Sequence, residues 1–133
     1  MHIETDFSPF VKYKSLVVKN QLHNLGEGSS AVLSMLQYGE GYTDKSFAYL
    51  IGDYGLLAGY AYIEHFANHG EFGVFVHPNY RNSGFAKQLA KSVQQVISKS
   101  KYSGQPLDVA RAALPIFKQA FGDDYPISDI VKP

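Results

Sequence analysis

The segment Val74–Ile97 joins a strand pattern to a helix pattern, and this junction constrains the fold more than any other part of the chain. Before Pro78 the residues are apolar and β-branched, as in a buried strand. After Gly84, apolar residues recur at the spacing of one helix face, at Phe85, Leu89, Val93 and then Val96 or Ile97. We therefore expect a strand that runs into an amphipathic helix through a short polar loop.

The loop Arg81-Asn82-Ser83-Gly84 has the composition of an anion site. The first N–H groups of a helix have no partner within the helix, and the helix dipole adds positive potential, so this end binds phosphate oxygens. Gly84 permits close approach of the backbone, and Ala86 keeps the first turn small. Arg81 and Lys87 add positive charge. This chemistry suits a pyrophosphate.

The charge pattern around the loop is one-sided. Acidic residues are absent between Glu71 and Asp108, whereas that interval contains the basic residues Arg81, Lys87, Lys91, Lys99 and Lys101. Taken by itself, this charge pattern is better explained by a solvated helix face than by an anion site. The expected anion site therefore depends on the loop and the helix end.

The composition excludes several classes of protein. A chain of 133 residues with 45% hydrophobic and 18% charged residues fits one globular domain, residues 1–133. Without cysteine there is no disulfide, thiolate metal site or catalytic thiol. A formal net charge of zero argues against nucleic-acid binding, and no apolar run approaches the length of a membrane span. The start "MHIETDFSPF" has no signal layout, so we expect a soluble cytoplasmic protein.

Outside the junction the sequence predicts two early helices, then a meander, then a parallel strand. The early helices should run from Ser8-Pro9 to about Leu25 and begin again after Ser29 or Ser30. Strands are expected at His2–Asp6, Ser46–Ile51, Leu56–Phe66, Glu71–His77 and Leu107–Ala110. If the last of these joins the sheet beside Glu71–His77, the junction helix is a crossover between parallel strands. A final helix with Pro115 in its first turn should end at Gly122, and the tail supplies an edge strand.

The spacing Val76-x-Pro78-x-Tyr80-Arg81-x-x-Gly84-x-Ala86 resembles the acetyl-CoA-binding motif of the GNAT family of N-acetyltransferases. The order of the expected elements is similar to that of the family over nearly the whole chain, and "LDVARAALPIFKQAFG" is similar to its fifth strand and fourth helix. The resemblance implies an α/β fold of the α+β type. Its mixed, mostly antiparallel sheet is flanked by helices in the order β-α-α-β-β-β-α-β-α-(β).

The resemblance also implies the site for acetyl-CoA, the acyl donor. The fourth and fifth strands of the family separate, and the pantetheine arm pairs with the fourth strand, here with the backbone of Val74, Phe75 and Val76. The pyrophosphate would be bound by Arg81 and by the N–H groups of the loop and first helical turn, namely Asn82, Ser83, Gly84, Phe85, Ala86 and Lys87. No metal is expected, because His65-x-x-x-His69 would need a helix where the sequence predicts a hairpin turn.

The catalytic groups are less well specified. Some relatives place a glutamate base near Glu71, although an ordinary carboxylate at a strand edge explains this residue as well. Many relatives carry a tyrosine at Phe117 and an asparagine near Ala110, so the usual proton donor is absent. Tyr125 is the candidate acid, with Tyr102 and water as alternatives.

We expect an N-acetyltransferase that acts on a primary amine of a small molecule or protein. The alternatives are a catalytically degenerate GNAT-fold module that binds acyl-CoA or a protein partner and, from the loop chemistry alone, a nucleotide-binding protein. The acceptor and the oligomeric state stay open.

Overall fold

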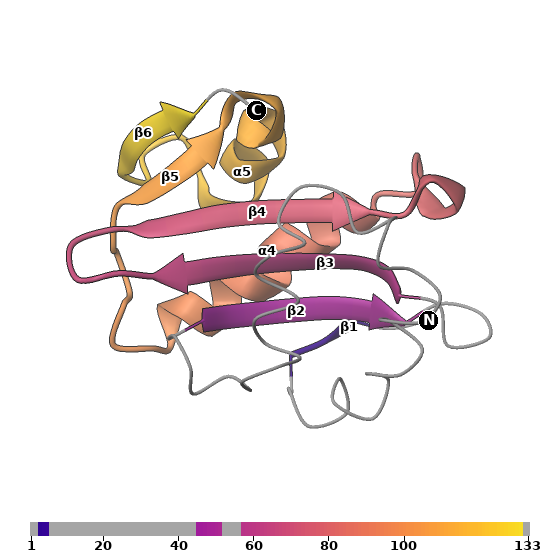
Figure 1. Ribbon diagram of the computed structural model, residues 1–133, viewed down its shortest axis with the longest axis horizontal. Helices are drawn as coiled ribbons and strands as arrows, with labels where there is room; N and C mark the ends of the chain where they lie inside the picture. The colour runs from indigo at the N-terminus through magenta and orange to yellow at the C-terminus, as the bar shows by residue number, and fades with distance from the viewer. Residues whose placement is uncertain (1–2, 6–44, 52–56, 132–133) are drawn as a thin grey trace.

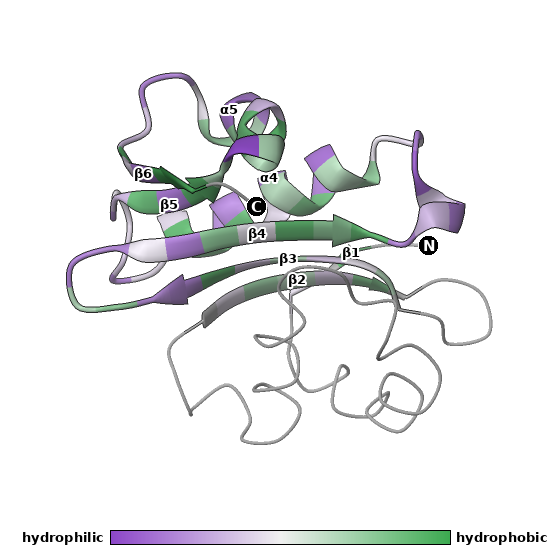
Figure 2. Ribbon diagram, turned by 45° about the horizontal axis from the view of Figure 1, so that its top comes forward, coloured by the Kyte–Doolittle hydropathy of each residue, from purple (hydrophilic) through white to green (hydrophobic). Residues whose placement is uncertain are grey.

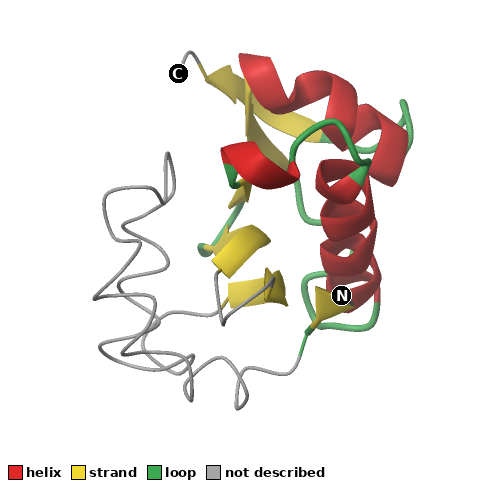
Figure 3. Cartoon of the chain, turned by 90° about the vertical axis from the view of Figure 1, so that its right-hand side faces the viewer, coloured by secondary structure: helices red, strands yellow, loops and turns green. Residues whose placement is uncertain are grey.

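The computed structural model describes residues 3–5, 45–51 and 57–131, and it contains a mixed sheet with helices on one face (Figures 1 and 3). The strands are β1 (Ile3–Glu4), β2 (Lys45–Ile51), β3 (Leu57–His65), β4 (Gly70–Val76), β5 (Leu107–Ala110) and β6 (Ile127–Val131). The helices are α4 (Phe85–Ser98) and α5 (Leu114–Phe121), with short 3-10 turns η3 (Pro78–Tyr80) and η4 (Arg111–Ala113). The two helices expected before residue 45 lie outside the described residues.

The strands follow one another across the sheet in chain order, β1 to β6. Pairing is antiparallel from β1 to β4 and parallel from β4 through β5 to β6. The predicted meander, the parallel fifth strand and the edge strand in the tail are therefore confirmed, with strand ends shifted by a residue or two. Helix α4 is the crossover between the parallel strands β4 and β5.

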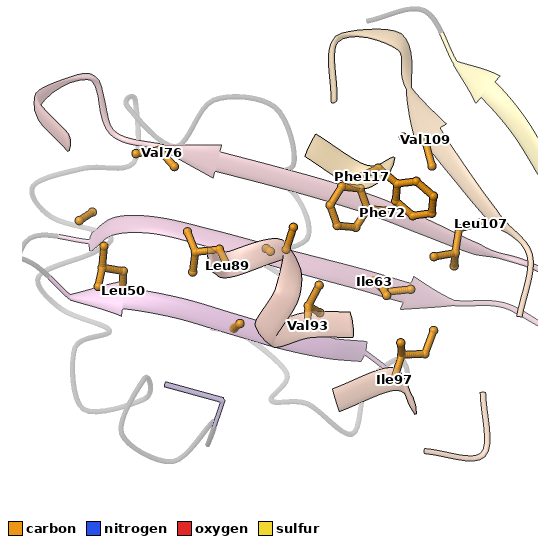
Figure 4. Packing of buried hydrophobic residues seen from close by; sticks show 14 residues of the cluster. Leu50, Ile63, Phe72, Val76, Leu89, Val93, Ile97, Leu107, Val109 and Phe117 are labelled. Carbon is orange, nitrogen blue, oxygen red and sulfur yellow. The ribbon is translucent and has the colours of Figure 1, made fainter. Parts of the chain in front are cut away.

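The two faces of the sheet carry different side chains because successive residues of a strand point to opposite faces. One face holds Ala61, Ile63 and Phe72 in the main core (Figure 4). Helices α4 and α5 lie on this side of the sheet (Figure 2). The other face holds aromatic rings in contact with one another: Phe47, Tyr49, Tyr60, Tyr62 and Phe75. Tyr60 and Tyr62 therefore lie on the opposite face of β3 from Ala61 and Ile63.

Helix α4 packs closely on β3. Its buried residues are Leu89, Ala90, Val93 and Ile97, whereas Phe85 is only partly buried. A Cβ on Gly59 would lie 2.9 Å from Leu89 Cδ1 and 3.0 Å from the carbonyl oxygen of Phe75. Glycine at this position of β3 thus lets α4 pack closely against the sheet at Leu89.

Helix α4 ends at Ser98, one residue beyond Ile97. The hydroxyl groups of Ser98 and Ser100 donate to the carbonyls of Gln95 and Ile97 at 2.8 Å. Serine hydroxyls that bond to the backbone in this way compete with continued helix. Helix α5 agrees with the sequence, with Pro115 in its first turn and Gly122 at its C-terminal end with φ +90°.

None of the described helices is both long and apolar enough to cross a membrane.

Candidate active site

Strands β4 and β5 form a fork. Their recorded pairs are Gly70 with Leu107, Glu71 with Asp108 and Phe72 with Val109, and β4 continues to Val76 beyond the last pair. Figure 1 shows the two strands diverging from this point. A cavity of about 230 Å³ opens in the fork, and we call it the fork hollow; its lining residues are Tyr62, Phe72, Gly73, Val74, Ala110, Ala112, Ala113 and Ile116.

The backbone of β4 offers polar groups to the fork hollow. The Gly70 N–H donates to the Pro106 carbonyl at 2.9 Å, and the Val76 carbonyl accepts from Arg81 Nε at 2.9 Å. The backbone N–H and C=O groups of Gly70 and Val76 therefore point away from β3. Because the bonding direction alternates along a strand, Val74 also presents its N–H and C=O toward the fork. The same alternation turns the backbone groups of Phe75 toward β3.

The predicted phosphate loop forms a second cavity at the N-terminus of α4. Asn82 and Gly84 adopt left-handed conformations, with φ of 65° and 79°, and the first turn of the helix holds no acidic residue. The first helical bond runs from the Gln88 N–H to the Gly84 carbonyl at 3.2 Å, so the N–H groups before it are available to a ligand. The cavity of about 300 Å³, the helix hollow, is lined by Val76, Tyr80, Arg81, Asn82, Gly84, Phe85, Ala86, Lys87, Ile116 and Gln119.

Most of the predicted loop residues therefore line one cavity. Ser83 is the member of the predicted loop that does not line it. Arg81 lies with Cζ 5.8 Å from the centroid of the Phe75 ring, and its bond to the Val76 carbonyl fixes the side chain beside β4. Arg81 thus links the end of the strand to the start of the helix.

A third cavity of about 170 Å³ lies at the closed end of the fork. We call it the acidic hollow; its lining residues are Tyr62, Glu71, Phe72, Asp108, Ala110 and Val131. The three cavities share residues in order. Ile116 lines both the helix hollow and the fork hollow, and Tyr62, Phe72 and Ala110 line both the fork hollow and the acidic hollow. They form a series from the helix N-terminus to a pair of carboxylates.

The carboxylates of the acidic hollow repel one another. Desolvation raises the pKa of Glu71, the carboxylates of Glu64 and Asp108 raise it further, and His69 opposes the shift. Glu64 is the cross-strand partner of Glu71 in β3. A raised pKa brings a carboxylate closer to the range in which a general base works at neutral pH, which fits the role predicted for Glu71.

His69 and Asp108 belong to the same cluster. His69 Nε2 lies 3.5 Å from Asp108 Oδ2, and the Ser128 hydroxyl donates to Asp108 Oδ1 at 2.8 Å. Ligand atoms of His69, Glu71 and Asp108 lie within 4.8 Å of one another, close enough to hold a divalent cation. The predicted absence of a metal stays a prediction.

The residues considered as proton donors lie in different places. The Tyr125 hydroxyl donates to the Gln105 carbonyl at 2.8 Å, burial raises the pKa of Tyr125, and the residue lines none of the three cavities. Phe117 is fully buried, stacked on Phe121 with ring centroids 4.4 Å apart. Ala110 lines both the fork hollow and the acidic hollow. Tyr125 as the acid remains an untested prediction.

The sequence did not single out Asp108 or Ile116, which line the cavities, and it suggested Tyr62 only as part of an acceptor pocket. Asp108 lines the acidic hollow because the parallel pairing of β4 and β5 places it beside Glu71. Ile116 lines the fork hollow because α5 packs beside the fork. A signal for Tyr62 existed in Gly73, its cross-strand partner. A Cβ at Gly73 would lie 2.4 to 2.7 Å from three atoms of the Tyr62 side chain, so glycine leaves room for that ring.

Comparison with known proteins gives one family match. The model of the acetyltransferase (GNAT) family matches residues 26–104. No curated protein matches the chain. Among solved structures, a GNAT-family acetyltransferase from Staphylococcus aureus Mu50 is 15% identical, with a TM-score of 0.49 over 74% of this chain and 66% of that one.

Two other solved structures are similar at the same level. A GNAT-superfamily phosphinothricin acetyltransferase from Sinorhizobium meliloti, in complex with AcCoA, is 17% identical, with a TM-score of 0.42 over 73% of this chain and 59% of that one. A chimera of the Vibrio cholerae spermidine N-acetyltransferase and hSSAT is 14% identical, with a TM-score of 0.46 over 90% and 79%. The chain spans less than two thirds of the length of the Staphylococcus and Sinorhizobium proteins.

Proposed function

The chain belongs to the GNAT acetyltransferase family, and on that premise we propose that it transfers an acetyl group from acetyl-CoA to a primary amine. The observation that carries this proposal is the series of cavities from the N-terminus of α4, along the open edge of β4, to Glu71. A donor with a phosphate end and a thioester end needs such a series. The acceptor amine would approach from the acidic hollow.

The donor would bind through backbone groups more than side chains. Its pyrophosphate would take the N–H groups at the start of α4, with Arg81 and Lys87 adding charge. Its pantetheine amides would pair with the N–H and C=O of Val74, which point into the fork. The thioester would then lie where the fork hollow meets the acidic hollow.

The chemistry requires a neutral amine next to the thioester carbonyl. Glu71 would accept the proton that the amine loses, directly or through a water molecule, and its raised pKa supports this role. The nearby carboxylates would attract an ammonium group from solvent before it is deprotonated. The acceptor class proposed is therefore a cationic amine on a small molecule or a protein.

The test has a binding arm and a turnover arm. Isothermal titration with acetyl-CoA, CoA and ATP should give binding of the first two and not of ATP. A thiol-release assay with spermidine, lysine-bearing peptides and neutral amines should give turnover with the cationic acceptors. Binding of acetyl-CoA without thiol release across the panel would favour a catalytically degenerate module, which the absence of a hydroxyl on Phe117 makes the second candidate. Absence of CoA binding would refute both.

A further inference from the structure

Tyr62 lies at the boundary between the fork hollow and the acidic hollow. Three of the described residues line both cavities, namely Tyr62, Phe72 and Ala110. Phe72 and Ala110 have hydrocarbon side chains, so within this shared wall the hydroxyl of Tyr62 is the group that can donate a proton. The position matters because the proposed donor and acceptor would meet at this boundary.

The ring of Tyr62 lies over Gly73, which is the first residue of β4 beyond the stretch that pairs with β5. Tyr62 pairs across the strands with Gly73, and β4 and β5 pair as far as Phe72. A Cβ on Gly73 would lie 2.4 Å from Cε1 and 2.7 Å from the hydroxyl oxygen of Tyr62. The hydroxyl therefore lies against the backbone of β4 at the branch point of the fork.

The other tyrosines considered as donors lie away from this boundary. The Tyr125 hydroxyl donates to the Gln105 carbonyl, and Tyr102 stacks on His65 with ring centroids 4.0 Å apart. Tyr102 lines a separate surface cavity with Lys101 and Gly104. Neither residue lines the fork hollow or the acidic hollow.

We propose that Tyr62 is the general acid that protonates the departing CoA sulfur, an inference that rests on the proposed acetyltransferase function. The amine nitrogen attacks the thioester carbonyl carbon, so that a C–N bond forms and the C–S bond breaks. The amine proton goes to Glu71, and the Tyr62 hydroxyl gives its proton to sulfur, which leaves as the CoA thiol. Glu71 then returns its proton to solvent and Tyr62 regains one, so the net reaction yields an amide and CoA.

The first experiment compares kcat in Tyr62→Phe and Tyr102→Phe. Phenylalanine keeps the ring on Gly73, so circular dichroism and the melting temperature should report a folded variant. We expect Tyr62→Phe to lower kcat about 10²-fold, the lower end of the range for general acid-base catalysis, because a thiolate is already a fair leaving group. The KM for acetyl-CoA should change little, and the alkaline decline of kcat should disappear. Tyr102→Phe should match the wild type.

A second measurement needs no turnover. A hydrogen bond from Tyr62 to sulfur would stabilise the thiolate of bound CoA, so the bound thiol should titrate at a lower pH in the wild type than in Tyr62→Phe. Ultraviolet absorbance of the thiolate measures this, and we expect a difference of about one to two pH units. Tyr102→Phe should again match the wild type.

The outcomes separate this inference from the proposed function. If the wild type turns over and Tyr62→Phe retains its kcat and its alkaline decline, Tyr62 is not the acid. A loss of kcat in Tyr125→Phe instead of Tyr62→Phe would give the role to Tyr125. If the wild type binds CoA without turnover, the thiol titration still decides whether Tyr62 contacts the sulfur, and equal values in wild type and Tyr62→Phe would refute the inference. Absence of CoA binding would overturn both proposals.

Discussion

The ring of Phe117 lies edge-on against the ring of Phe72, with centroids 5.3 Å apart and planes at 65°. Phe72 lines the fork hollow and the acidic hollow, so Phe117 sits directly behind the wall of the proposed site. Figure 4 shows both rings within the core. The position at which many relatives carry a tyrosine is thus a packing position in this chain.

Phe117→Tyr should therefore fail to raise turnover. Phe117 is fully buried and lines none of the three cavities, so an added hydroxyl would enter the core instead of reaching the thioester. A buried hydroxyl without a partner costs about 1–3 kcal/mol, and chemical denaturation should detect that loss. A clear rise in kcat at unchanged stability would mean that the ring can turn toward the fork.

Gly84→Glu should abolish binding of acetyl-CoA. Gly84 has φ +79°, a region where a side chain costs about 1–2 kcal/mol, and the new carboxylate would repel phosphate at the start of α4. Gly104 has φ +80° and lies away from the three cavities, so Gly104→Glu carries the same backbone cost without the repulsion. Titration calorimetry should show binding in the Gly104 variant only. Equal loss in both variants would point to unfolding.

Arg81→Ala should weaken CoA binding by about 1–3 kcal/mol, the scale of a hydrogen bond to a charged group. Its effect has two sources, because the side chain supplies charge and also bonds to the Val76 carbonyl at the strand end. Lys99, at the C-terminal end of α4, is the control, and Lys99→Ala should leave the dissociation constant unchanged. Equal weakening in both variants would indicate a diffuse basic surface.

The strands and α4 could be predicted because their signals are local. The β-branched run ending at Val76 and the helical spacing from Phe85 to Ile97 each specify an element without knowledge of its neighbours. The phosphate loop could be predicted for the same reason, since Arg81 to Lys87 are contiguous. Ala90, which the sequence did not select, is buried in the face of α4 that packs on the sheet.

The acceptor end of the site could not be predicted, because it depends on pairing between distant segments. Glu71 meets Asp108 through the register of β4 and β5, and it meets Glu64 through the register of β3 and β4. The place of Tyr62 depends on where the fork opens, which no pattern within β3 records. Ten tyrosines in the sequence gave no basis for choosing one, whereas the shared walls of the cavities do.

Removal of divalent metal should leave activity unchanged, as the sequence predicted. His69, Glu71 and Asp108 are near enough to bind a cation, but the proposed reaction uses Glu71 as a base and requires it to be unliganded. Dialysis against a chelator followed by the thiol-release assay measures this. Added Zn²⁺ should inhibit in competition with the amine. Loss of turnover on chelation, with recovery on adding metal, would contradict the base role of Glu71.

Glu71→Gln should lower kcat and raise the stability of the folded protein at neutral pH. Removing the base should lower kcat by roughly 10²–10⁴-fold, with CoA affinity unchanged. The folded protein holds the Glu71 proton more tightly than the unfolded chain does, so wild-type stability falls as pH rises through the raised pKa. The stability gain of Glu71→Gln should therefore be present at neutral pH and vanish below about pH 4, where unfolded carboxyls are protonated too.

Glu64→Gln separates the base role of Glu71 from a general effect of acidic charge. Repulsion by Glu64 helps to raise the pKa of Glu71, so its removal should move the acidic decline of kcat/KM to lower pH. The rate at neutral pH should then change much less than in Glu71→Gln. If the acidic decline stays in place in Glu64→Gln, the group that titrates in the rate is not Glu71. If it stays in place in Glu71→Gln as well, the amine's own ionisation controls the reaction.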